Sequence, residues 1–272
     1  MGHPFEDFLY KKVIRSLMLT SKLGRQSVLG RADAGSNFEH MYENKPEGDG
    51  PLGWVVDWAL LNLPAVKATR NRKDAILKIL KNEIANNQLS GKKTYVIDVG
   101  AGTSRYLLDL AREYSAGSVE ALSIDYDRES LNLGKKIAEA VGAQKKFIRY
   151  TRANAFRLAH MKYLGKKRHW TPNVMIASGF IYYLDDEAVK NALKEILTHL
   201  DPGGLLIMSS IRRSPSQKLM EKVCTTTDRQ AWVLHYREPE SVRHMMFDAG
   251  FREVLIGEDP WGMYNVCTGR KT

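Results

Sequence analysis

One stretch of sequence, residues 95–104 (YVIDVGAGTS), constrains the fold of this chain more than any other. The apolar run before the first glycine predicts a buried β-strand, Gly100 and Gly102 predict a tight turn, and residues 105–111 predict a helix. The glycines let the backbone turn sharply and approach a ligand, and the start of the helix presents free N–H groups. The stretch therefore predicts a nucleotide-like ligand, and a plain strand-to-helix turn is the alternative interpretation.

The composition of the 272 residues, with 43% hydrophobic and 26% charged residues and a mean hydropathy of -0.37, is that of a soluble globular protein. No apolar run approaches the length of a membrane span. The first residues are acidic at Glu6 and Asp7, where a signal peptide would be basic, so we expect a cytoplasmic protein. Cys224 and Cys267 have no metal-ligand spacing, so we expect free thiols and no metal site.

The formal net charge of +10 favours anionic partners such as nucleic acid, an acidic lipid surface or an acidic small substrate. Scattered basic residues of the kind found here are typical of solvated helix faces, and no RNA-binding motif accompanies them. A nucleic-acid partner is therefore an alternative rather than the preferred interpretation. The basic groups are Lys11, Lys12, Arg15, Lys22 and Arg25; Lys67, Arg70, Arg72 and Lys73; and Lys145, Lys146, Lys166, Lys167 and Arg168.

Residues 1–90 predict a helical N-terminal region that caps the rest of the chain and contributes to acceptor binding. Apolar residues from Phe5 to Met18 recur at three- and four-residue spacing, which predicts a helix that packs onto the main domain, with an anionic membrane surface as the alternative. Residues 29–51 predict a loop, because glycine, asparagine, aspartate and proline replace the apolar pattern. Further helices are expected over 54–63 and 74–84.

Residues 91–272 predict a separate domain in which strands alternate with helices. Repeated units of this length require a parallel sheet with helices on both faces. We therefore predict an α/β fold with a seven-stranded, mostly parallel Rossmann-like sheet and a C-terminal antiparallel hairpin. The expected strands after the first are 119–125, 146–150, 172–178, 205–209, 251–257 and 263–269, and the expected helices are 130–141, 186–200 and 239–249.

Ligands in such sheets lie beyond the carboxyl ends of the strands, where the glycine turn, Asp125, Asn154 and Ser178 all fall. Asp125 follows Gly102 at the distance where an acidic residue accepts hydrogen bonds from both hydroxyls of a ribose. Its charge also disfavours a ligand with a 2′-phosphate. Asp127 is the alternative for the ribose role, because strand ends are uncertain by a few residues.

Two features separate the glycine turn from a dinucleotide site. The third glycine of the dinucleotide motif would fall at Arg105, and the carboxylate of Asp98 ends the strand. A carboxylate beside a pyrophosphate is unfavourable, whereas a carboxylate beside an ammonium group is favourable. The turn therefore predicts a nucleoside with a positively charged tail.

On these motifs the chain resembles the class I methyltransferases that use S-adenosylmethionine. Residues 98–104 match their first motif, with Ser104 in place of the last glycine, and residues 123–127 match the end of their second strand. Residues 153–155 stand at the usual Gly-Asp-Ala turn, and residues 200–204 match the turn before their fifth strand. The resemblance covers residues 92–272. Residues 41–46 and 60–64 also look like a less-described bacterial branch, some members of which are fused to a hydrolase.

The resemblance implies a set of residues that bind S-adenosylmethionine. It places Asp98 near the amino group of the cofactor, Asp125 at the ribose and Asn154 at the adenine amino group, with Tyr126 or Phe156 against the adenine ring. The full set is Asp98, Gly100, Ala101, Gly102, Asp125, Tyr126, Asn154, Ala155, Ser178 and Gly179.

Methyl transfer from a sulfonium needs chiefly positioning and desolvation, which agrees with the lack of a catalytic triad in the sequence. Candidate acceptor-side catalytic residues are Tyr182, Tyr183, His40 and Tyr42. Residues 178–181 lack the Asn-Pro-Pro-Tyr or Asp-Pro-Pro-Tyr segment of many amino-group methyltransferases, which favours a small-molecule or lipid-like acceptor. The alternatives are an RNA methyltransferase, aminocarboxypropyl transfer from the same cofactor, a nicotinamide-dependent enzyme and a noncatalytic nucleoside-binding module. The oligomeric state stays open.

Overall fold

The computed structural model of the protein describes residues 4–144, 146–154 and 170–272. Within these residues it forms one seven-stranded sheet with the strand order β3-β2-β1-β4-β5-β7-β6. Strands β1 to β5 pair in parallel, and β7 lies antiparallel between β5 and β6. The predicted mostly parallel sheet with a C-terminal antiparallel pair is therefore confirmed. The strands are β1 (Thr94–Val99), β2 (Val119–Asp125), β3 (Ile148–Arg152), β4 (Val174–Ala177), β5 (Leu205–Ile211), β6 (Phe251–Glu258) and β7 (Tyr264–Lys271).

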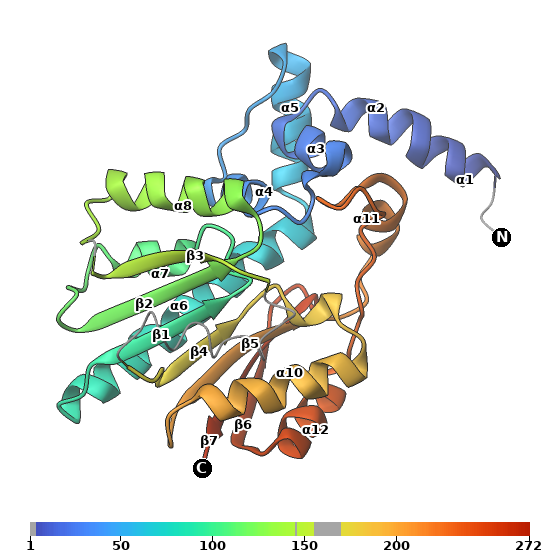
Figure 1. Ribbon diagram of the computed structural model, residues 1–272. Helices are drawn as coiled ribbons and strands as arrows, with labels where there is room; N and C mark the ends of the chain where they lie inside the picture. Colours follow the sequence, from blue (N-terminus) through green and yellow to red (C-terminus); the bar gives the residue numbers. More distant parts are fainter. Residues whose placement is uncertain (1–3, 145, 155–169) are drawn as a thin grey trace.

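Helices cover both faces of the sheet, as Figure 1 shows. On one face α6, α7 and α8 pack against inward side chains such as Val96 and Ile176, and on the other α10 and α12 pack against their neighbours Ile97 and Met175. Burial on both faces explains why the strands are continuously apolar. These helices are α6 (Pro64–Leu89), α7 (Arg105–Leu110), α8 (Arg128–Ala140), α10 (Asp186–His199) and α12 (Pro239–Ala249).

The chain order of the strands creates a switch point between β1 and β4. From β1 the chain moves outward to β2 and β3, and it then crosses back to β4 and β5 on the other side of β1. Crossovers that leave in opposite directions open a crevice at the carboxyl ends of the two central strands. Figure 1 shows the N-terminal helices gathered at this end of the sheet.

The N-terminal region is a series of short helical segments followed by two longer helices. Helix α4 contacts α6 and α8, and α5 contacts α3 and α6, so the region is packed against the sheet domain. The segments are α1 (Pro4–Phe8), η1 (Leu9–Ile14), α2 (Arg15–Met18), α3 (Lys22–Gln26), η2 (Ser27–Arg31), α4 (Gly35–Glu43) and α5 (Gly50–Leu61), with η4 (Ile181–Tyr183) and α11 (Gln217–Val223) in the later part of the chain.

The prediction of a loop over residues 29–51 is wrong, because α4 occupies the middle of that range. The buried residues of α4 include Asn37, Glu39 and His40, which are polar. Each of these side chains has hydrogen-bond partners inside the fold, so its burial is compensated. A helix with a polar buried face gives no apolar periodicity, which is why the pattern failed to predict it.

The first helix packs only part of its predicted apolar face onto the main domain, through Ile14 and Met18. Phe5, Phe8 and Leu17 remain 71%, 59% and 43% exposed, although Met18 is buried. Glu6 contacts Lys218 and Asp7 contacts Lys222, so ion pairs also join this helix to α11. Ion pairs and the apolar contacts of Ile14 and Met18 together orient the helix. In the described part of the chain, no helix is both long and apolar enough to cross a bilayer.

Candidate functional site

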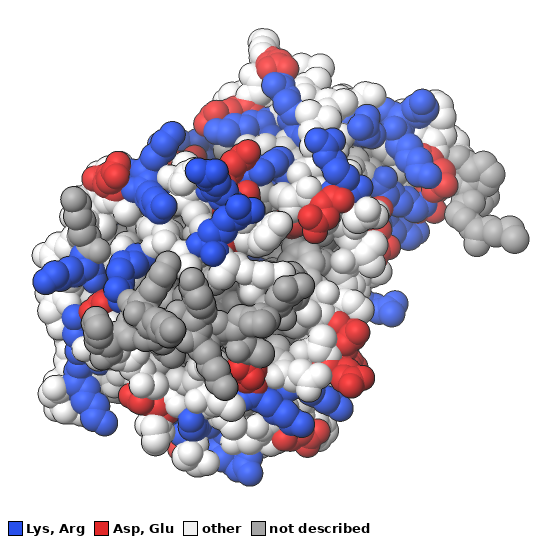
Figure 2. All heavy atoms as spheres, in the orientation of Figure 1, with Lys and Arg blue, Asp and Glu red and all other residues white. Residues whose placement is uncertain are grey.

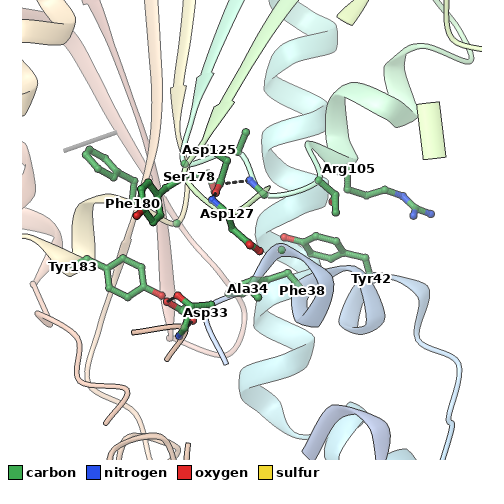
Figure 3. Close-up of a pocket in the computed structure, with 18 of the residues that line it drawn as sticks. Asp33, Ala34, Phe38, Tyr42, Arg105, Asp125, Asp127, Ser178, Phe180 and Tyr183 are labelled. Atoms are coloured by element: carbon green, nitrogen blue, oxygen red, sulfur yellow. Dashed lines mark hydrogen bonds between the residues drawn. The ribbon is translucent and has the colours of Figure 1, made fainter. Parts of the chain in front are cut away.

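A cavity of about 440 Å³ lies at the carboxyl ends of the central strands, between the strand-end loops and the N-terminal helices (Figure 3). We call its two sides the loop wall and the cap wall. The loop wall consists of Gly100, Ala101, Gly102, Asp125, Tyr126, Asn154, Ser178, Gly179 and Phe180. The cap wall consists of Asp33, Ala34, Gly35, Phe38, Tyr42 and Arg72, and Tyr106 and Tyr183 also line the cavity.

The glycine turn forms the centre of the loop wall. Gly100 and Gly102 have φ angles of 65° and 57°, and Ser104 is also left-handed at 59°, immediately before α7. A side chain on Gly102 would come within 3.2 Å of the Cα of Gly35 in the cap wall. The turn therefore needs glycine both for its backbone conformation and for the close approach of the cap.

Asp125 is held in the cavity by backbone donors from the two adjacent loops. Its carboxylate accepts hydrogen bonds from the Gly102 N–H at 2.7 Å and from the Asp127 N–H at 2.8 Å. Burial raises the pKa of the Asp125 carboxyl. Asp127 instead caps α8 and pairs with Arg31 at 2.9 Å, although it also lines the cavity. Two carboxylates only two residues apart thus have different surroundings.

Asp98 lies beneath the loop wall rather than in it, with a side chain that is fully buried. The Tyr106 hydroxyl donates to its Oδ1 at 2.7 Å, and its Oδ2 is buried without a hydrogen-bond partner. Burial raises the pKa of the Asp98 carboxyl to about 8. Because Tyr106 lines the cavity, it joins Asp98 to the cavity surface.

The remaining predicted cofactor residues come together in the loop wall, apart from Ala155, which lies outside the described residues. Tyr126 is 62% exposed beneath the Arg152 guanidinium at 5.1 Å, so its ring is accessible to a ligand. At the end of β4, the Gly179 N–H donates to the Ser209 hydroxyl at 3.2 Å. The structure thus brings together residues from four strand ends.

The predicted tyrosines surround the opposite side of the cavity. Tyr42 and Tyr183 line it, and Tyr182 lies directly behind, with its hydroxyl bound to Arg72. Figure 3 shows Tyr183 pointing toward Asp33, while Tyr42 extends from α4. Burial raises the pKa of all three phenols, so they are protonated at neutral pH. They therefore act as neutral hydrogen-bonding groups rather than as bases.

The structure does not bring His40 to the cavity. Its ring is 1% exposed, and its Nε2 forms a 2.8 Å hydrogen bond with Asp57, which also accepts from the Leu23 and Glu47 N–H groups. His40 thus joins α4 to α5 and to the preceding loop. Among the described residues, His40, Glu43 and Glu47 also have ligand atoms within 4.8 Å of one another, away from the cavity. The absence of a metal stays a prediction.

Sequence reasoning missed two charged residues that shape the cavity. Arg72, expected on a solvated helix face, is only 3% exposed. Glu39, in the expected loop, accepts from the Thr103 hydroxyl at 2.9 Å and pairs with Arg105, which ties α4 to the glycine turn. Arg72 is in phase with the apolar stripe of α6, four residues before Ile76, and this spacing was the available signal.

Residues 3–271 match a protein family described as "Putative methyltransferase". The chain belongs to this family. A curated relative, the "Uncharacterized protein YnbC" of Escherichia coli K12, is 28% identical over 237 residues, which are 86% of this chain and 39% of that protein. The chain therefore spans about two fifths of the length of that relative.

Solved structures of low identity share the fold of this methyltransferase. A possible exported protein from Bordetella parapertussis has a TM-score of 0.71 at 20% identity, covering 94% of this chain and 85% of that one. The S-adenosylmethionine-dependent methyltransferase SibL has a TM-score of 0.57 at 11% identity, covering 99% of this chain and 78% of that one. Magnesium protoporphyrin IX methyltransferase from Synechocystis, solved with bound SAH, has a TM-score of 0.55 at 13% identity, covering 87% of this chain and 94% of that one. The fold is that of class I methyltransferases, and S-adenosylmethionine is the cofactor of this family.

The residues of the cavity fit that cofactor. The glycine turn presents backbone where a Cβ would narrow the cavity, and Asp125 keeps acceptor capacity beyond its two backbone hydrogen bonds. A buried carboxylate oxygen without a partner, Asp98 Oδ2, lies at the same end as the turn. Such an oxygen can accept a hydrogen bond from an ammonium group, and a dinucleotide has no ammonium group beside the glycine turn.

Proposed function

We propose that this methyltransferase transfers a methyl group from S-adenosylmethionine to a small-molecule or lipid-like acceptor held beneath the N-terminal helices. The observation that supports this proposal is the aromatic lining of the cavity. Phe38 and Tyr42 of the cap wall and Tyr183 of η4 place aromatic rings in a cavity of about 440 Å³, which cofactor and acceptor would share. A cavity of this size and lining suits a compact, partly apolar acceptor.

The loop wall would hold the cofactor in an extended pose along the strand ends. Gly100 to Gly102 would lie along its methionine portion, Asp125 would accept from the ribose hydroxyls, and Asn154 would accept from the adenine amino group. Tyr126 offers an exposed ring for the adenine. Asp98, through its contact with Tyr106, would favour the ammonium group at the other end of the cofactor.

When bound, the cofactor supplies a methyl group that its sulfonium already activates. The contribution of this chain is then to hold both reactants in line and to exclude water. Tyr42 and Tyr183 would orient the acceptor through neutral hydroxyls, since burial raises the pKa of each phenol. The Trp232 indole N–H donates to the Tyr183 hydroxyl at 3.0 Å, which fixes the direction of that ring.

The surface charge supports a small acceptor over RNA. On the face in Figure 2, Lys and Arg are interspersed with Asp and Glu instead of forming a continuous basic stripe. An RNA methyltransferase remains the alternative that the net charge of +10 favours. The cytoplasmic location expected from the sequence stays a prediction as well.

The test is turnover of labelled S-adenosylmethionine against separate pools of polar metabolites, lipids and RNA. We expect S-adenosylhomocysteine to form with a metabolite or lipid pool, and we expect the Asp125→Ala variant to form none. Formation of methylthioadenosine instead would identify aminocarboxypropyl transfer. Turnover with RNA alone, steeply reduced by salt, would contradict the proposed acceptor class.

A further inference from the structure

Arg72 is a buried cation that has no anionic partner in the described part of the chain. It lines the cavity from the middle of α6, and yet it is only 3% exposed. Its Nη1 donates to the Tyr182 hydroxyl at 2.7 Å and its Nη2 approaches the Tyr42 hydroxyl at 3.5 Å. The guanidinium also lies 4.5 Å from the ring centre of Tyr264 and 5.6 Å from that of Phe38. None of these four neighbours has a carboxylate.

This environment is unusual for a buried arginine, because an isolated buried charge is costly unless an opposite charge compensates it. Within the described residues, no carboxylate pairs with Arg72, whereas Arg105 pairs with Glu39 and Arg270 pairs with Glu83. The Arg72 Nε is also buried without a hydrogen-bond partner. A guanidinium with an open donor fits the planar geometry of a carboxylate.

The contacts of Arg72 place its guanidinium at the β4 side of the cavity. The Tyr182 hydroxyl that binds Arg72 lies 3.3 Å from the point where a Cβ of Gly179 would stand, at the end of β4. Tyr106, whose hydroxyl donates to Asp98, lines the same cavity as Arg72. Asp125 and Asn154 follow β2 and β3, which lie on the side of β1 away from β4, so Arg72 and these two residues are at opposite sides of the cavity.

Asp98 thus offers an acceptor oxygen and Arg72 a cation, and each has a buried atom without a hydrogen-bond partner among the described residues. An amino acid carries the complementary pair, an ammonium group and a carboxylate. We propose that Arg72 binds a carboxylate in the cavity, with the amino-acid tail of S-adenosylmethionine or an acidic acceptor as its source. This inference rests on the proposed function, because both sources belong to that reaction.

Calorimetry with S-adenosylmethionine and its decarboxylated form tests the first source, since these ligands differ only by the carboxylate. The wild type should prefer the carboxylated ligand by about 10- to 100-fold, as expected for a charged hydrogen bond in a buried site. Arg72→Met should reduce the preference to less than about 3-fold, and Arg72→Lys should retain part of it. Lys78→Met, which removes an exposed charge from the same helix, should keep the wild-type preference.

Benzoate titrated into the complex with S-adenosylhomocysteine tests the second source. Benzoate binding that Arg72→Met abolishes and Lys78→Met preserves would assign the open donor to an acidic acceptor. The inference is overturned if folded Arg72→Met protein keeps both the wild-type carboxylate preference and the wild-type benzoate binding. If the Met variant does not fold, the same two measurements are made on Arg72→Lys, and full wild-type values for both would overturn the inference. Failure of the wild type to bind either nucleoside ligand would instead contradict the proposed function.

Discussion

The loop wall presents backbone groups and the carboxylate of Asp125, whereas the cap wall presents aromatic rings and the guanidinium of Arg72. The loop wall is built from the ends of parallel strands, whose positions follow from the sheet. The cap wall is built mainly from α4 and α6. Helix α6 packs on the sheet through apolar side chains, whereas α4 is joined to the glycine turn through paired polar groups such as Glu39 and Thr103. Under the proposed function, the loop wall would hold the cofactor and the cap wall would contact the acceptor.

The largest expected effect comes from the loop wall. Asp125→Ala should weaken S-adenosylmethionine binding by about 1,000-fold, because two charge-assisted hydrogen bonds to the ribose are lost. Calorimetry measures this change. Asp127→Ala is the matched control, since it removes the cap of α8 and should lower the free energy of unfolding by about 1 kcal/mol with little effect on binding. Unchanged affinity in Asp125→Ala would overturn the ribose role.

A substitution of His40 tests whether this buried residue of α4 stabilises the fold without taking part in the reaction. His40→Ala leaves Asp57 buried without its side-chain partner, so the free energy of unfolding should fall by about 3 kcal/mol. Urea denaturation measures this, and kcat of the folded fraction should remain near wild type. His244→Ala, at an exposed position of α12, is the control. A large loss of kcat without loss of stability would instead indicate that His40 takes part in catalysis on the acceptor.

Gly35 tests the contact between the two walls. A Cβ at this position would come within 2.8 Å of the Gly102 Cα and the Ser130 hydroxyl, so Gly35→Ala must push α4 away from the glycine turn. We expect a loss of about 2 kcal/mol in unfolding free energy, together with weaker cofactor binding. Gly257→Ala is the control, because its Cβ would meet the nearest atom at 3.9 Å. Equal effects of the two substitutions would show that the walls are not in close contact.

The expected effect that is smallest over a single pH unit is a pH dependence from Asp98, beneath the loop wall. Its pKa is raised to about 8 by burial, so the folded state binds more protons than the unfolded state between roughly pH 4 and 8. The stability of the wild type should therefore fall as pH rises through this window, by at most about 1.4 kcal/mol per pH unit from this group.

Asp98→Asn removes this ionisation while it keeps an acceptor for Tyr106. Urea denaturation at pH 5, 6, 7 and 8 should show the variant gaining stability over the wild type as pH rises, with no further gain above pH 8. Asp248→Asn, at an exposed position, controls for the change from carboxylate to amide. A constant difference between Asp98→Asn and wild type over this range would contradict the buried-acid interpretation.

The sheet and the loop wall were predictable because their signals are local. Apolar strands, the glycine turn and the spacing of Asp125 after Gly102 each lie within a few tens of residues, and the parallel pairing of β1, β2 and β4 brings their ends together. The antiparallel pairing of the last two strands was also predicted, as a C-terminal hairpin. Asp98 was predicted at the site, but not that it would lie beneath Tyr106.

The helix α4 and the role of Arg72 were not predictable, because their partners are far away in the sequence. Arg72 binds Tyr182, 110 residues later, and Glu39 binds Thr103, 64 residues later. A buried charge has no local signature, since only the folded environment distinguishes it from a solvated one. The sequence by itself determined the sheet, its glycine turn and the cofactor family. The tertiary structure decided which charged residues face the cavity, because burial and pairing are properties of the whole fold.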